Sequence, residues 1–340
     1  MKSWQKMMII AIVVTALIIS GTLAYFQFSS RRRLLISTTT SLWDTGLLTQ
    51  VEKAFEAKYP IDLQFTAVGT GVAIEQGRNG DVDGVLVHAP SQEYTFLQQG
   101  YGVDRKIIAY NFFTIVGPQD DPAKISGLNV TETLKAIAAY GRNQTAHPQQ
   151  AKVWVSRGDG SGTHTKEQSL WKLAKFNYTQ ISVESWYATP GGAMGETLLK
   201  AEEFSAYTLS DIGTYLTYHD KNHLITLSSF LGGMENQNYD LLNVYSVMAV
   251  NQTRQHHVNF NDTILFIKFL ISDEGQQIIE NYGQTDFGSS GLLFRATVHL
   301  IAQNSSEQIA QWIRKYAFLG NPASECPSQY RDLHHPELYS

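Results

Sequence analysis

The run Leu34-Leu35-Ile36-Ser37-Thr38-Thr39-Thr40-Ser41 decides the fold, because it passes from apolar residues directly into a row of hydroxyl side chains. Its first four residues predict a buried strand. Apolar residues from Leu47 to Phe55 then recur with helical spacing until Pro60 closes the helix. The segment Ile61–Val68 predicts a second strand. Strands and helices that alternate in this way indicate an α/β fold with a largely parallel sheet.

Small polar residues follow each of these predicted strands. The turn Gly69-Thr70-Gly71 comes after the second strand and starts a helix, and residues 83–88 predict a third strand before Pro90. In open α/β sheets, ligands bind beyond the carboxyl ends of the strands. We therefore expect a ligand site that is lined by hydroxyl groups, namely those of Thr39, Thr40, Ser41 and Thr70.

A turn rich in glycine and hydroxyl groups lies near the middle of the chain. Residues 156–168 read Ser-Arg-Gly-Asp-Gly-Ser-Gly-Thr-His-Thr-Lys-Glu-Gln. A helix that starts near Thr163 leaves its first amide N–H groups unpaired, and the three glycines let the backbone approach a ligand. Arg157 and Lys166 add positive charge, and Ser161 and Thr163 add neutral donors. The turn therefore predicts an anion site.

The order of the elements predicts two lobes. A second set of elements runs from about residue 118 to residue 243, and extended apolar stretches at 111–117 and 244–251 bracket it as two crossovers of a hinge. Predicted helices at 262–271, 274–282 and 306–318 pack back on the first lobe, and a polar tail follows. The expected domains are an N-terminal anchor (1–33), a first lobe (34–112 and 246–320), a second lobe (113–245) and the tail (321–340).

Composition limits the classes of function. The chain has 340 residues, of which 43% are hydrophobic and 17% are charged, as is typical of a globular protein with a well-formed core. A formal net charge of −5 gives no basic field, so nucleic acid is not an expected partner. Cys326 is the single cysteine, which excludes an internal disulfide, a cysteine-based zinc site and a lipid-modified cysteine anchor. We expect no metal-ion site.

The N-terminus predicts a targeting element. Residues 7–28 are almost uniformly apolar, Lys2 and Lys6 precede them, and three arginines follow. A segment of this length can span a bilayer as a transmembrane helix, so we expect an uncleaved signal anchor, with a cleaved signal peptide as the alternative. Six Asn-X-Ser/Thr sequons favour an extracytoplasmic location for the rest of the chain. These candidate glycosylation sites are Asn129, Asn143, Asn177, Asn251, Asn261 and Asn304.

Several motifs occur in a fixed order along residues 35–294. In the first half they are Thr38-Thr39-Thr40-Ser41, Val68-Gly69-Thr70-Gly71 and Val87-His88-Ala89-Pro90. In the second half they are Ser156-Arg157-Gly158-Asp159, Ser161-Gly162-Thr163-His164 and Ala206-Tyr207-Thr208-Leu209. Collinear motifs are more specific than any one glycine-rich loop. In this set and order, the chain resembles the tungstate-binding proteins of ABC importers.

The resemblance implies an α/β protein with the two-lobed periplasmic-binding-protein type II fold, which closes on one tetrahedral oxyanion. It implies a monomer that delivers tungstate, or failing that molybdate, to an ABC permease and its ATPase, without a cofactor. The family's contacts correspond here to Thr39, Ser41, Arg157 and Thr163, with Lys166 beside them. Thr40 lies in the same turn as Thr39, and turn geometry adds Thr70 and Ser161. Phe112, Gly160 and Ile212 stand where the family often has charged residues, so the charge balance of the site is expected to differ.

Phosphate is the alternative ligand. A site that contains only donors suits fully ionised tungstate or molybdate, whereas hydrogen phosphate needs an acceptor for its proton. Asp159 or Asp44 supplies that acceptor if its carboxylate faces the cleft; otherwise each caps the turn or helix that follows it. An anchored oxyanion sensor is a further alternative.

The same turn also has the residue types of a hydrolase active site, because Ser161, His164 and Asp159 lie close together in sequence. The spacing does not fit. A nucleophile elbow has glycine two residues before the serine, where Asp159 stands, and a histidine three residues downstream does not reach round to act as a general base. We therefore expect no catalytic activity.

Overall fold

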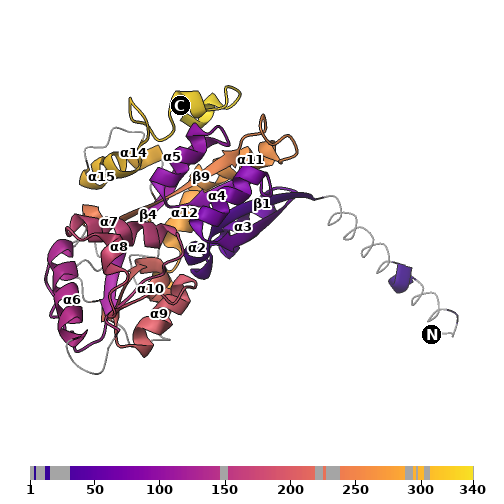
Figure 1. Cartoon of the computed structure of the whole chain (residues 1–340). Helices are drawn as coiled ribbons and strands as arrows, with labels where there is room; N and C mark the ends of the chain where they lie inside the picture. Colours follow the sequence, from indigo (N-terminus) through magenta and orange to yellow (C-terminus); the bar gives the residue numbers. More distant parts are fainter. Residues whose placement is uncertain are drawn as a thin grey trace.

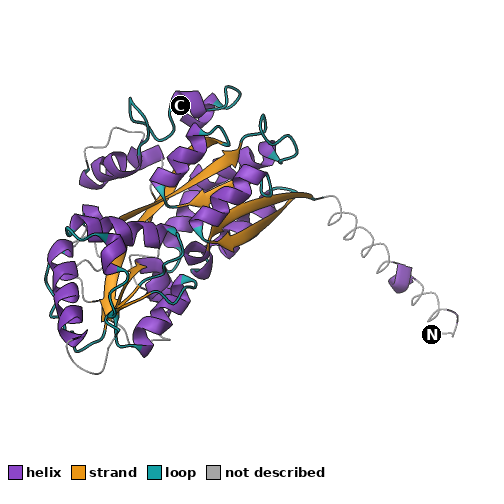
Figure 2. Cartoon of the chain, in the orientation of Figure 1, coloured by secondary structure: helices purple, strands orange, loops and turns teal. Residues whose placement is uncertain are grey.

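A layer of strands with helices on both faces forms the first lobe (Figures 1 and 2). The computed structural model describes residues 4, 12–15, 31–145, 152–218, 225–226, 238–287, 294–295, 298–301 and 307–339. The elements of this lobe are β1 (Arg32–Thr39), α2 (Thr40–Asp44), α3 (Leu47–Lys58), β2 (Ile61–Val68), α4 (Thr70–Asn79), β3 (Gly84–Val87), α5 (Pro90–Gln98), α11 (Phe260–Ile271), α12 (Asp273–Asn281), α13 (Gln284–Phe287) and β10 (Phe294–Arg295).

Side-chain alternation along β3 explains the two helical layers. Val85 and Val87 pack with apolar residues of α4 and α5, whereas Leu86 between them packs with α3, α11 and α12. β1 pairs in parallel with both β2 and β3. Parallel strands that are buried on both faces read as continuous apolar runs in the sequence, and β1 to β3 lie where those runs predicted them.

Two long strands connect the lobes. β4 (Gly102–Gly117) pairs with β9 (Leu242–Val250) as far as Phe112, and with β7 (Tyr207–Asp211) from Phe113 onward. β9 runs antiparallel to both β3 and β4, because it returns the chain that β4 carries out. The sheet is therefore mixed, and the prediction of a largely parallel sheet is wrong for its centre.

The second lobe is built around the end of β4 and a core of tryptophans. Trp154, Trp171 and Trp186 are at most 1% exposed and belong to one apolar cluster. Across both lobes the strand order is β2-β1-β3-β9-β4-β7-β5-β6. In the second lobe, β5 (Trp154–Val155) is parallel to both β6 (Tyr187–Ala188) and β7. The elements of this lobe are α6 (Val130–Thr145), β5 (Trp154–Val155), α7 (Gly162–Leu173), α8 (Tyr178–Ile181), β6 (Tyr187–Ala188), α9 (Met194–Glu203), α10 (Ile212–Tyr218) and β8 (Ile225–Thr226).

The last long helix packs at the junction of the lobes. α15 (Gln308–Ala317) follows the short α14 (Val298–Ile301). Ile313 and Ala317 are buried in the cluster that contains Trp154 and Val244. The sequence predicted that this helix packs back on the first lobe, and its apolar residues also contact the second-lobe core.

The C-terminal segment, predicted only as a polar tail, is folded onto β4. Glu325 accepts a hydrogen bond from Lys106 Nζ at 2.6 Å and another from the amide of Ile107 at 2.5 Å. Cys326 and Leu338 of this segment are buried. The polar composition of the segment gave no sign of this packing. Glu325 can dock on β4 because it forms an ion pair with Lys106.

Most of residues 1–33, including the predicted anchor, lie outside the described residues. Among the described residues, no helix has the length and apolar character needed to cross a membrane. Asn251 donates from its side-chain amide to the carbonyl of Gly100, and Asn304 lies outside the described residues. The other four sequon asparagines are exposed, namely Asn129, Asn143, Asn177 and Asn261.

Candidate functional site

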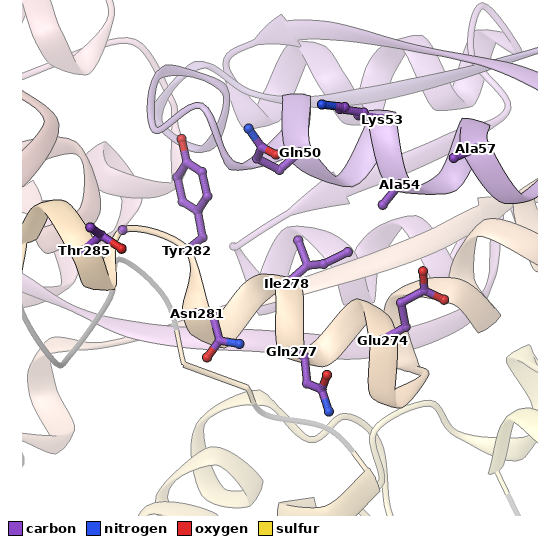
Figure 3. A pocket seen from close by; sticks show the side chains of 11 residues that line it. Gln50, Lys53, Ala54, Ala57, Glu274, Gln277, Ile278, Asn281, Tyr282 and Thr285 are labelled. Atoms are coloured by element: carbon purple, nitrogen blue, oxygen red, sulfur yellow. The ribbon is translucent and has the colours of Figure 1, made fainter.

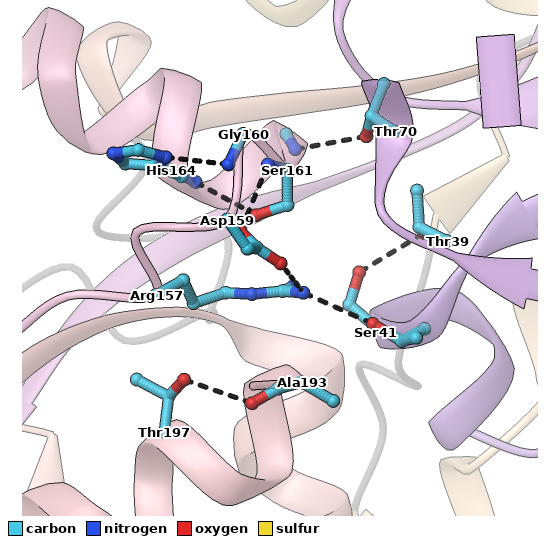
Figure 4. A network of polar contacts seen from close by, with 12 residues as sticks. Thr39, Ser41, Thr70, Arg157, Asp159, Gly160, Ser161, His164, Ala193 and Thr197 are labelled. Atoms are coloured by element: carbon cyan, nitrogen blue, oxygen red, sulfur yellow. Dashed lines mark hydrogen bonds and ion pairs between the residues drawn. The ribbon is translucent and has the colours of Figure 1, made fainter. Parts of the chain in front are cut away.

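A turn of hydroxyl groups lies where β1 ends. Thr39 caps α2, since its Oγ1 accepts a hydrogen bond from the amide of Leu42. The same Oγ1 lies 3.2 Å from Ser41 Oγ, and both side chains are buried. Thr40 Oγ1 accepts a hydrogen bond of 3.3 Å from Arg157 Nη2 of the second lobe. The predicted hydroxyl turn therefore faces the predicted arginine across the two lobes (Figure 4).

The turn between β5 and α7 supplies that arginine. Gly158 has a φ of 63°, and a Cβ there would lie 1.9 Å from Thr189 Cγ2, so glycine is required on both grounds. Ser161 caps α7 by accepting from the amide of His164. Arg157 is held beside the start of this helix and is 2% exposed.

The starts of α4 and α7 meet at the same place. The amide of Gly162, in the first turn of α7, donates to Thr70 Oγ1 at 3.0 Å. Thr70 is the first residue of α4. Helix N-termini carry partial positive charge and unpaired amide groups, so their convergence beside Arg157 favours an anion.

Two buried groups near this point have no hydrogen-bond partner in the part of the chain that the structure describes. They are Arg157 Nε and Thr163 Oγ1. A buried polar group without a partner costs about 1–3 kcal/mol, and native proteins rarely leave one. Both groups can donate, and the second lies in the first turn of α7. An oxyanion is the chemical class that such donors suit.

The comparisons with known proteins agree with this geometry. Residues 27–274 match the PBP superfamily domain. The tungstate-binding protein TupA of Peptoclostridium acidaminophilum is 30% identical over 291 residues, which are 83% of this chain and 94% of that protein. The chain belongs to the family of tungstate-binding proteins of ABC transporters.

Solved structures of this family share its fold. A tungstate ABC transporter structure from Geobacter sulfurreducens has a TM-score of 0.63 and 40% identity, and the match covers 74% of this chain and 98% of that chain. The tungstate-binding protein TupA from Desulfovibrio alaskensis G20 has a TM-score of 0.63 and 35% identity, covering 78% and 100%. The family resemblance drawn from the motifs is therefore confirmed, and the fold is a mixed α/β fold of the periplasmic-binding-protein type II kind.

Asp159 lies inside the site and also caps its own turn. Its Oδ1 accepts from the amide of Ser161 at 3.0 Å, and its Oδ2 lies 2.6 Å from Arg157 Nη2. Burial opposes ionisation of this carboxyl, but the Arg157 guanidinium and the Ser161 donors outweigh it and hold the pKa of Asp159 below its usual range. An ionised carboxylate thus shares the charge of Arg157. Asp44, the other candidate acceptor, is the last residue of α2.

Lys166 is not part of the cluster that Arg157, Thr40 and Thr70 form. Its Nζ donates to the carbonyl of Leu242 at 2.9 Å and lies 4.4 Å from the centre of the Tyr316 ring. Burial lowers the pKa of Lys166 to about 7. Its ammonium group therefore ties α7 to the start of β9 and does not face Arg157.

Ser161 and His164 do not form a catalytic pair. His164 Nδ1 accepts from the amide of Gly160 at 2.8 Å, and its Nε2 lies 2.7 Å from the Tyr178 hydroxyl. Both ring nitrogens are therefore engaged away from Ser161 Oγ. The relatives named above are binding proteins by description, which agrees with this arrangement.

Sequence reasoning missed two polar side chains that lie beside the hydroxyl turn. His88 directly follows β3, and its Nε2 lies 3.4 Å from Ser41 Oγ. Thr214 of α10 donates from Oγ1 to the carbonyl of Ser41 at 3.2 Å. The rule that placed Thr70 at the end of β2 applies equally to His88 at the end of β3. Thr214 had no such signal, since it lies within a helix.

A hollow of about 770 Å³ lies elsewhere, between α3 and the α12–α13 segment (Figure 3). Lys53 and Glu274 bring opposite charges to it, and uncharged residues such as Gln50 and Asn281 line the rest. This hollow does not gather donors around one point. It is therefore a poor candidate for an anion site.

Proposed function

We propose that this protein binds tungstate, with molybdate next in preference, between its two lobes outside the cytoplasmic membrane, and delivers it to an ABC permease and its ATPase for import. The observation that carries the proposal is the cluster around Arg157. There, the buried Arg157 Nε and Thr163 Oγ1 have no hydrogen-bond acceptor among the described residues. Hydroxyl side chains lie at the adjoining helix starts, namely those of Thr39, Thr40, Ser41, Thr70 and Ser161.

The donors can account for tight binding of a dianion. Each hydrogen bond to a charged group contributes roughly 1.5–3 kcal/mol, so four or five of them suffice without full neutralisation by ion pairs. Helix starts supply partial charge without the loss of side-chain entropy. Tungstate and molybdate are fully ionised at neutral pH and need only donors.

Titration calorimetry of the full chain with tungstate, molybdate, sulfate and phosphate tests the proposal. We expect tungstate to bind most tightly, molybdate next, and one ion per chain. Native mass spectrometry of the purified protein should find tungsten and no phosphorus. A protein that binds none of the four anions contradicts the proposal.

Phosphate is the second candidate, and the position of Asp159 favours it. Its carboxylate lies beside Arg157, where it would accept the proton of hydrogen phosphate. Asp159→Asn separates the two ligands. If tungstate is the ligand, removing a negative charge should strengthen its binding; if phosphate is the ligand, phosphate binding should weaken because the acceptor is lost.

The location of the protein follows from the same proposal. An N-terminal helix within residues 1–33 would hold the chain at the outer face of the membrane, and glycosylation at the exposed Asn129, Asn143, Asn177 and Asn261 would agree with that side. Co-purification with a permease from detergent-solubilised membranes tests the transport role. Tungstate binding without any such permease would favour an anchored sensor instead.

A further inference from the structure

His88 lies where the two lobes meet, and its ring contacts both of them. It follows β3 of the first lobe and is 2% exposed. Its Nε2 faces Ser41 Oγ at 3.4 Å. On the other side, the ring packs against Gly162 at the start of α7, where an added Cβ would lie 2.6 Å from His88 Cε1. The ring therefore lies between the hydroxyl turn and the start of α7.

Asn243 fixes the orientation and the protonation of this ring. The Asn243 amide nitrogen donates to Asn111 Oδ1 at 2.8 Å and to the Tyr245 hydroxyl at 3.0 Å, so its oxygen faces His88 Nδ1 at 2.8 Å. An oxygen acceptor requires an N–H group at Nδ1. Burial lowers the pKa of His88 to about 4, so Nε2 is unprotonated at neutral pH and accepts from Ser41.

Two aromatic rings pack beside the His88 ring at tilted angles of 31° and 34°. The Tyr245 ring lies 4.9 Å from the His88 ring, centre to centre, and the Phe113 ring lies 6.2 Å away. These two residues belong to β9 and β4, the strands that join the lobes. The position of His88 is therefore fixed from the hinge side.

A cavity of about 210 Å³ lies beside the ring, between α7 and the first lobe. His88 and Ser91 of the first lobe line it, together with Gly162 and Lys166 of α7. Two hydrogen bonds hold α7 to the first lobe nearby, one from the Gly162 amide to Thr70 Oγ1 at 3.0 Å and one from Gln92 Nε2 to Thr165 Oγ1 at 3.2 Å. Both bonds draw α7 toward the first lobe, so the packing of the His88 ring against Gly162 limits how closely α7 approaches.

We propose that His88 is a specificity-determining residue, a rigid spacer that sets the size of the closed oxyanion site by stopping α7 at Gly162. The inference rests on the proposed function. Tungstate and molybdate are larger than sulfate and phosphate, so a fixed separation of the lobes lets the donors reach a large oxyanion while leaving them too far from a small one.

Substitutions of His88 and of Gly162 should change the ratio of tungstate to sulfate affinity in opposite directions. Competition titrations of the full chain measure this ratio. His88→Ala lets α7 approach, and the ratio of tungstate to sulfate affinity should fall by roughly tenfold, the scale at which small changes of pocket size alter discrimination. Gly162→Ala pushes α7 away, and the same ratio should rise because sulfate loses its contacts first. His88→Gln, with a side chain of similar reach, should stay within about threefold of the wild-type ratio.

The control is His257→Ala, which removes an exposed imidazole that contacts the Gly80 carbonyl, far from the hydroxyl turn in sequence. It should leave the ratio unchanged. If His88→Ala does not fold, Gly162→Ala alone still tests the proposal. A ratio that is unchanged in the variants, or that moves in the same direction in both, overturns it. Absence of tungstate binding by the wild-type chain would instead contradict the proposed function, so the two failures are distinguishable.

Discussion

Arg157 is the cation of the proposed oxyanion site, and its removal should be the most damaging single change there. Arg157→Ala removes at least two charge-assisted hydrogen bonds to a dianion, each worth about 1.5–3 kcal/mol, so tungstate affinity should fall by roughly 100-fold or more. Titration calorimetry measures the loss. Lys53→Ala, which removes an exposed lysine of α3, is the matched control and should leave the affinity unchanged. Equal losses in the two variants would show that only general charge matters.

Single residues of the site were predictable where a local rule applied to them. Thr39, Thr70 and Ser161 follow strands or start helices, and the structure places them together as those rules require. Lys166 lies apart from these residues, because one further turn of α7 carries it away from the helix start, and its ammonium group then donates to a carbonyl of β9. The neutral state of His88 could not be read from the sequence, since it depends on burial.

Helix α7 carries a buried carboxyl group, that of Glu167, and this group should make the free energy of unfolding depend on pH. Glu167 accepts from Trp154 Nε1, Ser156 Oγ and the Tyr187 hydroxyl. Burial nevertheless raises the pKa of Glu167 from 4.5 to about 7. At this group the folded protein therefore holds more protons than the unfolded chain between these pH values, and the contribution of Glu167 to stability should decline as the pH rises through them.

Glu167→Gln should remove most of that decline. Urea unfolding at several pH values from 5 to 8 measures the free energy of unfolding of each variant, and the stability of the wild type relative to Glu167→Gln should fall as the pH rises. Glu203→Gln, at an exposed position of α9, is the control and should keep the wild-type slope. Identical slopes in all three proteins would contradict the burial argument.

The C-terminal segment should contribute to stability and not to ligand affinity. Glu325→Ala leaves Lys106 buried without its ion pair, and breaking such a pair costs about 3–5 kcal/mol. Glu203→Ala breaks an exposed pair with Lys200 and should cost less than about 1 kcal/mol. Urea unfolding measures both losses. A fall in tungstate affinity with Glu325→Ala would place the segment in the binding mechanism instead.

Elements were predictable from apolar periodicity, but their partners were not. The sequence predicts strands and helices that the structure confirms as β1, α3, β2 and α11 within a few residues. The docking of the C-terminal segment depends on a pairing between Lys106 and Glu325, which lie 219 residues apart. No local pattern in a polar segment indicates such a pairing.

The whole molecule should gain stability from its ligand, because tungstate is proposed to bind only when both lobes are folded and in contact. At a free concentration about 100 times the dissociation constant, a ligand stabilises the folded state by about 2.7 kcal/mol. Differential scanning calorimetry should therefore show a higher Tm with tungstate. The Tm of Arg157→Ala should rise far less at the same concentration, because a 100-fold weaker affinity leaves only about 0.4 kcal/mol of stabilisation. An equal tungstate-dependent rise in both proteins would indicate binding away from Arg157.

β4 belongs to both lobes as one unbroken strand of 16 residues, and this limits how the molecule can open. A flexible loop would let the lobes swing freely, but a strand that is hydrogen-bonded on each side of Phe112 and Phe113 can only bend or twist as a ribbon. Opening should therefore be a small elastic bend of β4 that its hydrogen bonds to β9 and β7 resist. Such a strand would return the two lobes to one resting angle after the ligand leaves.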